Sequence, residues 1–246
     1  MYHHVAPERP AASEMGPEDG WDFFLSPRGF EGQLRELSRR GLRFVSLLAI
    51  VEAIRRDGKE PDGVAAITFD DGWSDGYEHA LPVLLGMGLT ATFFLTTDHL
   101  APGRTDRRKL GLAQIQELIS TGMTVGGHSR THSDLTRIPE ARAREEIAGC
   151  KEDLEQATGR GVTLFAYPGG EFNRRVVEMT RQAGYEAACS TLSPAPNDRS
   201  SLFWMFRDLL TEPMNTLGDR YRLSPWARRP LAWRVRRKLR RKLRDG

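Results

Sequence analysis

Cysteine is scarce in this sequence of 246 residues, and long apolar runs are missing. The two cysteines, Cys150 and Cys189, cannot build a disulfide framework, which fits a reducing compartment. The longest apolar stretch, 80–95, is interrupted by a proline and two glycines and is shorter than the ~20 residues that a bilayer crossing needs. The first 20 residues lack the apolar core of a signal peptide, so we expect a cytoplasmic protein.

The composition is that of a folded protein with an uneven distribution of charge. Apolar residues make up 39% of the chain and charged residues 28%, which is enough for one domain or two small ones with a core. Residues 226–246 hold ten basic residues and one acidic residue, a formal charge of +9, so the remainder carries −6. A nucleic-acid binder with a uniformly basic surface is therefore not expected.

The basic tail has an apolar stripe. Leu231, Val235, Leu239 and Leu243 recur every four residues, with arginines mainly on the opposite side of a helix. A basic amphipathic helix at 226–246 is typical of a segment that lies on anionic lipid, so we expect peripheral contact with the inner face of the membrane. A solvated, disordered tail or a nucleic-acid contact are the alternatives.

Short β-rich runs alternate with helical runs through the middle of the chain. This order predicts a parallel sheet covered by helices, either open or closed into a barrel, with functional groups at the carboxyl ends of the strands. The expected strands are 43–45, 64–69, 90–96, 123–126, 162–166 and 185–190, and the expected helices are 27–40, 46–56, 78–87, 112–120, 139–158 and 174–183.

Two groups of acid-base or metal-binding side chains follow predicted strands. Asp70 and Asp71 end the 64–69 run, and adjacent carboxylates are costly unless a cation or a proton relieves their repulsion. His128 and His132 follow the 123–126 run with a spacing that places two imidazoles on one face of a helical turn. One carboxylate and two imidazoles suit Zn²⁺ and also non-haem Fe(II). A solvated Asp-Gly turn and two unrelated surface histidines are the alternative interpretation.

The strings TFDDG at 68–72 and HSRTH at 128–132, in this order, resemble the first two motifs of the polysaccharide deacetylase family (NodB homology, carbohydrate esterase family 4). The similarity runs from residue 1 to about residue 209 and includes FAYPGG at 165–170. It implies a distorted (β/α) barrel with fewer than eight parallel strands over residues 1–225, followed by the basic C-terminal helix at 226–246. It also implies metal-dependent hydrolysis of an amide on an N-acylated sugar, which can be a polysaccharide, an oligosaccharide or a lipid-linked sugar. A catalytically inactive glycan-binding or scaffold protein with the same fold is the alternative.

The resemblance also assigns roles to individual residues. It implies that Asp71, His128 and His132 hold a divalent metal ion, expected to be Zn²⁺, and that Asp70 is the general base. The backbone N–H of Tyr167 would stabilise the oxyanion.

The general acid departs from the commonest family pattern. Many members carry it as a histidine late in the sequence, whereas no histidine follows His132 here. One subgroup supplies the acid from an N-terminal Tyr-His, and Tyr2-His3 matches that arrangement. The resemblance therefore points to His3 as the general acid, with His4 as the less favoured choice.

A second departure concerns the partner of the catalytic base. Many members have an arginine two residues before the proline of the Tyr-Pro motif, where this sequence has Ala166. Arg207 stands where the subgroup tends to carry an arginine, so we expect it to hold Asp70 ionised and oriented. An ordinary surface arginine is the alternative.

The 98–111 segment is rich in basic residues. It either meets an acidic or phosphorylated group of the substrate or forms a solvated face. These residues are Arg104, Arg107, Arg108 and Lys109.

Overall fold

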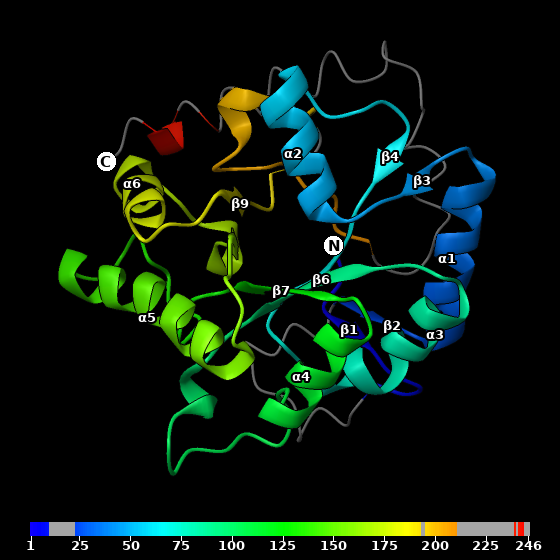
Figure 1. Ribbon diagram of the computed structural model, residues 1–246, viewed down its shortest axis with the longest axis horizontal. Coiled ribbons are helices and arrows are strands. Elements are labelled where there is room, and N and C mark those ends of the chain that lie inside the picture. The colour runs from blue at the N-terminus through cyan, green and yellow to red at the C-terminus, as the bar shows by residue number, and fades with distance from the viewer. Residues whose placement is uncertain (10–22, 193–194, 211–238, 240, 244–246) are drawn as a thin grey trace.

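A curled parallel sheet of five strands lies at the centre of the computed structural model, which describes residues 1–9, 23–192, 195–210, 239 and 241–243 (Figure 1). The strands follow one another in sequence order across the sheet, and two further strand pairs, also parallel, flank it. The sheet contains β5 (Ile67–Phe69), β6 (Ala91–Leu95), β7 (Thr124–Gly127), β8 (Leu164–Ala166) and β9 (Ala187–Cys189), and the pairs are β1 (His4–Val5) with β2 (Phe24–Leu25) and β3 (Arg43–Phe44) with β4 (Val64–Ala65).

Helices connect the strands of the sheet and lie around it (Figure 1). Two of them begin at serines whose hydroxyl oxygens accept a backbone N–H of the first turn: Ser26 from Gly29 and Ser46 from Ala49, each at 3.1 Å. None of the described helices combines the length and the apolar character that a membrane crossing requires. The helices are α1 (Pro27–Arg39), α2 (Leu47–Asp57), α3 (Leu81–Gly86), α4 (Leu112–Ser120), α5 (Glu140–Thr158) and α6 (Arg174–Gln182).

The alternation predicted from the sequence is confirmed, with two local differences. The run expected as one strand, 64–69, is two strands: β4 pairs with β3, whereas β5 pairs with β6 in the central sheet. The helix expected at 78–87 begins as a π-helical turn, Gly76–Ala80, before α3. Periodicity could not reveal either difference, because apolar residues continue through both transitions.

Terminal segments close the curled sheet into a distorted barrel with fewer than eight strands. Tyr2 forms a parallel bridge with Phe69 at the β5 edge, and Met205 forms one with Cys189 at the β9 edge. The backbone N–H of Leu210 donates to the carbonyl oxygen of Met1 at 3.2 Å. The two ends of the described main body therefore meet, and they complete the ring that β5 to β9 leave open.

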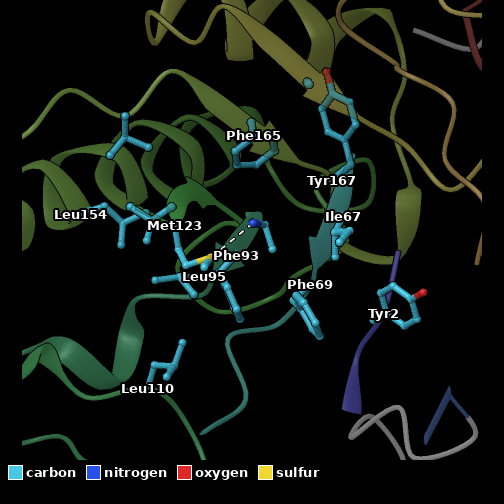
Figure 2. Close-up of a cluster of buried hydrophobic side chains, with 14 of the residues drawn as sticks. Tyr2, Ile67, Phe69, Phe93, Leu95, Leu110, Met123, Leu154, Phe165 and Tyr167 are labelled. Atoms are coloured by element: carbon cyan, nitrogen blue, oxygen red, sulfur yellow. Dashed lines mark hydrogen bonds between the residues drawn. The ribbon is translucent and has the colours of Figure 1, made fainter. Parts of the chain in front are cut away.

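Aromatic and aliphatic side chains pack together in the buried core (Figure 2). Phe69 and Phe93 stack with ring centroids 4.8 Å apart and planes inclined by 8°, which ties β5 to β6. Phe94 points to the other face of the sheet, where it packs with residues of α2. Gly126 in β7 is required there, because a Cβ atom at this position would lie 2.6 Å from the Phe94 ring.

The end of the basic tail contacts the folded body. Leu239 and Leu243 pack against the main core, and the Lys242 ammonium forms an ion pair with Glu171 and lies 5.2 Å from the centroid of the Phe172 ring. Two of the four residues of the predicted lipid-facing stripe thus contact protein. The other two residues, at 231 and 235, lie outside the described part of the chain, as does most of the predicted helix at 226–246.

Candidate active site

The two adjacent aspartates at the end of β5 point to different partners. Asp71 has φ +72°, in the left-handed region that aspartate tolerates better than most residues. This turn of the backbone separates the two carboxylates: Asp70 meets Arg207, and Asp71 meets the two imidazoles of His128 and His132. Both aspartates are buried, with 3% of Asp70 and 5% of Asp71 exposed. Each needs a cation nearby, because an uncompensated buried charge is strongly unfavourable.

Asp71, His128 and His132 form a compact group. The Oδ1 atom of Asp71 lies 3.2 Å from Nε2 of His128 and 3.1 Å from Nε2 of His132, and the three ligand atoms lie within 4.8 Å of one another. Burial alone would raise the pKa of Asp71, but the two imidazoles hold it well below its ordinary value. The structure therefore brings together the three residues predicted to bind metal.

The tautomer of His128 follows from its backbone partner. Its Nδ1–H donates to the carbonyl oxygen of Ala166 at 2.7 Å, and a carbonyl can only accept. The Nε2 lone pair of a neutral His128 is therefore directed towards Asp71 Oδ1. This arrangement is common for imidazoles that bind a metal, since the second nitrogen fixes the orientation of the ring.

The loop between the two histidines is held on α5. The Nε and Nη2 atoms of Arg130 each donate to the carboxylate of Asp153 at 2.8 Å. The N–H and the hydroxyl of Thr131 donate to the two carboxylate oxygens of Glu146, both at 2.8 Å, and Glu146 is fully buried. Gly149 lies between these carboxylates on the same helix face, where a Cβ atom would lie 2.6 Å from Nη1 of Arg130. Sequence analysis missed this anchor, although the spacing of 146, 149 and 153 places them on one face of a helix.

The donor set fits a divalent cation. Oδ1 of Asp71 is buried and accepts no well-formed hydrogen bond, although two imidazole nitrogens lie close to it. The Nε2 lone pair of a neutral His128 faces this oxygen, and two buried acceptors in contact are costly unless a cation lies between them. Two imidazoles and one carboxylate are ligands of catalytic Zn²⁺ sites, which keep a further position for water. The three side chains could therefore hold such an ion.

Arg207 is a buried partner of Asp70 and not a surface arginine. Its Nη1 and Nη2 atoms donate to Oδ1 and Oδ2 of Asp70, both at 2.7 Å, and its Nε donates to the carbonyl oxygen of Ser190 at 3.0 Å. Burial would raise the pKa of Asp70, but the Arg207 guanidinium outweighs it and holds that pKa below its ordinary value. Asp70 is therefore ionised at neutral pH and is able to accept a proton.

The two N-terminal histidines have separate environments. The His3 ring interacts electrostatically with Asp70, Asp71 and His128, and its Nδ1 is buried without a hydrogen-bond partner. Burial lowers the pKa of His3, and the two aspartates oppose this shift. Nδ1 of His4 lies 2.5 Å from Oδ2 of Asp75, so His4 already has a carboxylate partner. The structure thus places His3, the favoured candidate, beside the site.

The position of Tyr167 corrects one prediction. Its backbone N–H donates to the carbonyl oxygen of Cys189 at 3.1 Å, as part of the pairing between β8 and β9. Its hydroxyl donates to the carbonyl oxygen of Phe203 at 2.8 Å, and its ring is fully buried. The N–H expected to stabilise an oxyanion is therefore already used by the sheet, and Tyr167 acts as a core residue.

Comparison with known proteins identifies a family and two relatives whose names describe a deacetylase. A family profile described as polysaccharide deacetylase matches residues 57–188. YxkH of Bacillus subtilis is 24% identical over 207 residues, 84% of this chain and 68% of that protein. Poly-β-1,6-N-acetyl-D-glucosamine N-deacetylase of Staphylococcus aureus is 24% identical over 203 residues, 78% of this chain and 69% of that protein. The chain thus spans about two thirds of the length of both relatives.

A solved structure shares the fold. The Streptococcus pyogenes deacetylase PplD, solved in complex with acetate, superimposes with a TM-score of 0.76 and is 23% identical in sequence. The match covers 88% of this chain and 94% of that protein.

Proposed function

Since this chain belongs to the polysaccharide deacetylase family, we propose that it hydrolyses the amide bond of an N-acylated sugar at a divalent metal ion held by Asp71, His128 and His132. The observation that supports this proposal best is the buried Oδ1 of Asp71, which faces two imidazole nitrogens beside a second, ionised aspartate. Zn²⁺ is the metal we expect, and other divalent ions suit the same ligands.

The residues around the three ligands supply the proton transfers. A divalent ion in this place would lower the pKa of a water molecule and polarise the amide carbonyl. Asp70, kept ionised by Arg207, takes the proton of the water as its oxygen adds to the amide carbon. His3 gives a proton to the nitrogen as the C–N bond breaks, so the sugar leaves as an amine and the acyl group as a carboxylate. A protonated His3 is needed for this step, because an unprotonated amide nitrogen is a poor leaving group.

The names of the relatives support a proposal for the substrate class. The Staphylococcus aureus relative is named for the removal of N-acetyl groups from a glucosamine polymer. We propose an N-acetylated amino sugar as the substrate here, within a polysaccharide, an oligosaccharide or a lipid-linked sugar. Contact with anionic lipid through residues 226–246, together with a cytoplasmic location, is a separate proposal that rests on the charge of the tail.

An inactive glycan-binding or scaffold protein is the second candidate. The absence of a histidine after His132, and Ala166 in place of an arginine, favour it. The buried pair of Asp70 with Arg207 favours an enzyme. Arg207 supplies the positive charge that many family members supply with an arginine at the position of Ala166.

Substitution of the proposed base separates the two candidates. Asp70→Asn should leave the zinc content unchanged and lower acetate or formate release from a panel of N-acylated sugars by about 10²–10⁴-fold, the usual contribution of a general base. Metal content is measured on the purified protein and acyl release by a coupled assay. Asp98→Asn is the matched control, because Asp98 is half-exposed and pairs with Arg104.

Each outcome of this experiment has a distinct meaning. Unchanged release by Asp70→Asn would remove Asp70 from the mechanism. A wild-type protein that binds metal but releases no acyl group from any sugar favours the inactive candidate. A protein that takes up no divalent metal contradicts the proposal.

A further inference from the structure

The basic segment 98–111 is joined to the turn that follows Asp71. Lys109 forms an antiparallel bridge with Trp73, and the N–H of Leu110 donates to the carbonyl oxygen of Gly72 at 2.9 Å. The N–H of Ser74 donates in the opposite direction, to the carbonyl oxygen of residue 108, at 2.8 Å. These bonds hold one end of the segment beside the candidate metal ligands.

Lys109 and Trp73 both contact Asp71. The Nζ atom of Lys109 donates to the backbone carbonyl oxygen of Asp71 at 2.9 Å and lies 3.1 Å from the centroid of the Trp73 ring. The Nε1–H of Trp73 donates to Oδ2 of Asp71 at 3.1 Å. Trp73 is 7% exposed, so this contact is made away from bulk water, where a hydrogen bond to a charged group is stronger.

These contacts hold the backbone carbonyl and the Oδ2 atom of Asp71, while its Oδ1 faces the two histidines. A non-glycine residue in the left-handed region persists only where its surroundings enforce the conformation, so contacts of Asp71 must maintain φ +72°. The Lys109 ammonium holds the backbone carbonyl group of Asp71. The indole of Trp73 fixes the carboxylate oxygen that does not face the histidines.

We propose that Lys109 and Trp73 are positioning residues that hold Asp71 in the conformation needed to bind the metal. This inference rests on the metal site of the proposed function. It also changes the interpretation of the basic segment, because Lys109, one of its cations, contacts the proposed metal ligand Asp71. Arg104, by contrast, pairs with Asp98, and Arg107 is exposed.

The test measures metal affinity and the geometry of the metal site. Lys109→Met keeps the length of the side chain and removes its charge and donors, and Trp73→Phe removes the indole N–H but keeps an aromatic ring. We expect each to weaken Zn²⁺ binding about tenfold or more, measured by competition with a chromophoric chelator. The visible spectrum of the Co²⁺-substituted protein should also change, because it reports ligand geometry. Arg107→Met, in the same segment, is the matched control and should match the wild type in both measurements.

The possible results are distinguishable. Wild-type affinity and an unchanged Co²⁺ spectrum in both variants would overturn this inference and leave the proposed function intact. A wild-type protein that binds neither ion would overturn both. Thermal unfolding of the chelated proteins identifies a variant that fails to fold, in which case the other variant decides, and Lys109→Arg should recover part of the affinity lost in Lys109→Met.

Discussion

Backbone strain in the described part of the chain is concentrated at single residues of the candidate site. Asp71, Ser129 and His132 are the non-glycine residues with positive φ there, and they lie at or between the proposed ligands. Such conformations persist only where the surroundings enforce them, and they are common at functional sites. The sequence predicted all three proposed ligands but could not show this strain, because a residue type tolerates a conformation without requiring it.

The buried pair of Asp70 and Arg207 predicts a pH effect. The Arg207 guanidinium holds the pKa of Asp70 below its ordinary value in the folded protein, so the pair stabilises the fold fully above the pKa of an unfolded aspartate and less as the pH falls through the lowered pKa. Arg207→Met leaves a buried carboxylate unpaired and should lower the free energy of unfolding at pH 7 by about 3–5 kcal/mol. Burial then raises the pKa of Asp70, so the acid limb of the kcat/KM profile should move to higher pH.

Chemical denaturation and pH–rate profiles check both parts of this prediction. Arg207→Lys keeps the charge without the two-pronged contact, so its acid limb should lie between those of the wild type and Arg207→Met. An acid limb at the wild-type pH in Arg207→Met would show that Arg207 does not control the ionisation of the base.

At the level of elements, one face of α5 holds the loop that carries two of the candidate metal ligands. The helix was predicted from its periodicity, and its observed range, Glu140–Thr158, differs from the expectation by one residue. Its partner could not be predicted, because the contact of Arg130 and Thr131 with α5 depends on tertiary packing. The alternation of strands and helices along the chain and the helix starts follow from local patterns, whereas the split of 64–69 depends on the strand with which each half pairs.

Gly149→Ala tests the anchor on α5. Alanine in a helix is usually more stable than glycine by about 1 kcal/mol. At 149 the added methyl group would displace the Arg130 guanidinium from Asp153, so we expect weaker Zn²⁺ binding, by several-fold, without a large loss of stability in the chelated protein. Gly32→Ala in α1 is the matched control: its methyl group meets nothing within 4 Å, so it should stabilise the fold and leave metal affinity unchanged.

Equal metal affinity in Gly149→Ala and Gly32→Ala would contradict a role of α5 in holding the histidine loop. Affinity is measured by chelator competition and stability by thermal unfolding of the chelated proteins.

For the whole molecule, the charge imbalance between body and tail predicts salt-dependent lipid binding. A chain that ends at residue 225 loses a formal charge of +9, so we expect it to lose binding to vesicles that contain phosphatidylglycerol. The full chain should bind them in low salt and less in high salt, because screening weakens surface charge. Leu239 and Leu243 contact the core, so we assign the attraction to the basic residues of the tail and not to its apolar stripe.

Co-sedimentation with vesicles measures this binding. Uncharged phosphatidylcholine vesicles are the control, and a short DNA duplex tests the nucleic-acid alternative. Equal sedimentation of the shortened and full chains would exclude the tail as the lipid contact.

The closure of the barrel by both terminal segments has a consequence for biosynthesis. A nascent chain that has emerged from the ribosome through residue 192 already carries Asp71, His128 and His132, but the cation that keeps Asp70 ionised has not yet been added. We therefore expect such a chain to be able to capture a metal before it can turn over any sugar. Hydrolysis would become possible only after the segment that contains Met205 and Arg207 has been synthesised and has completed the ring.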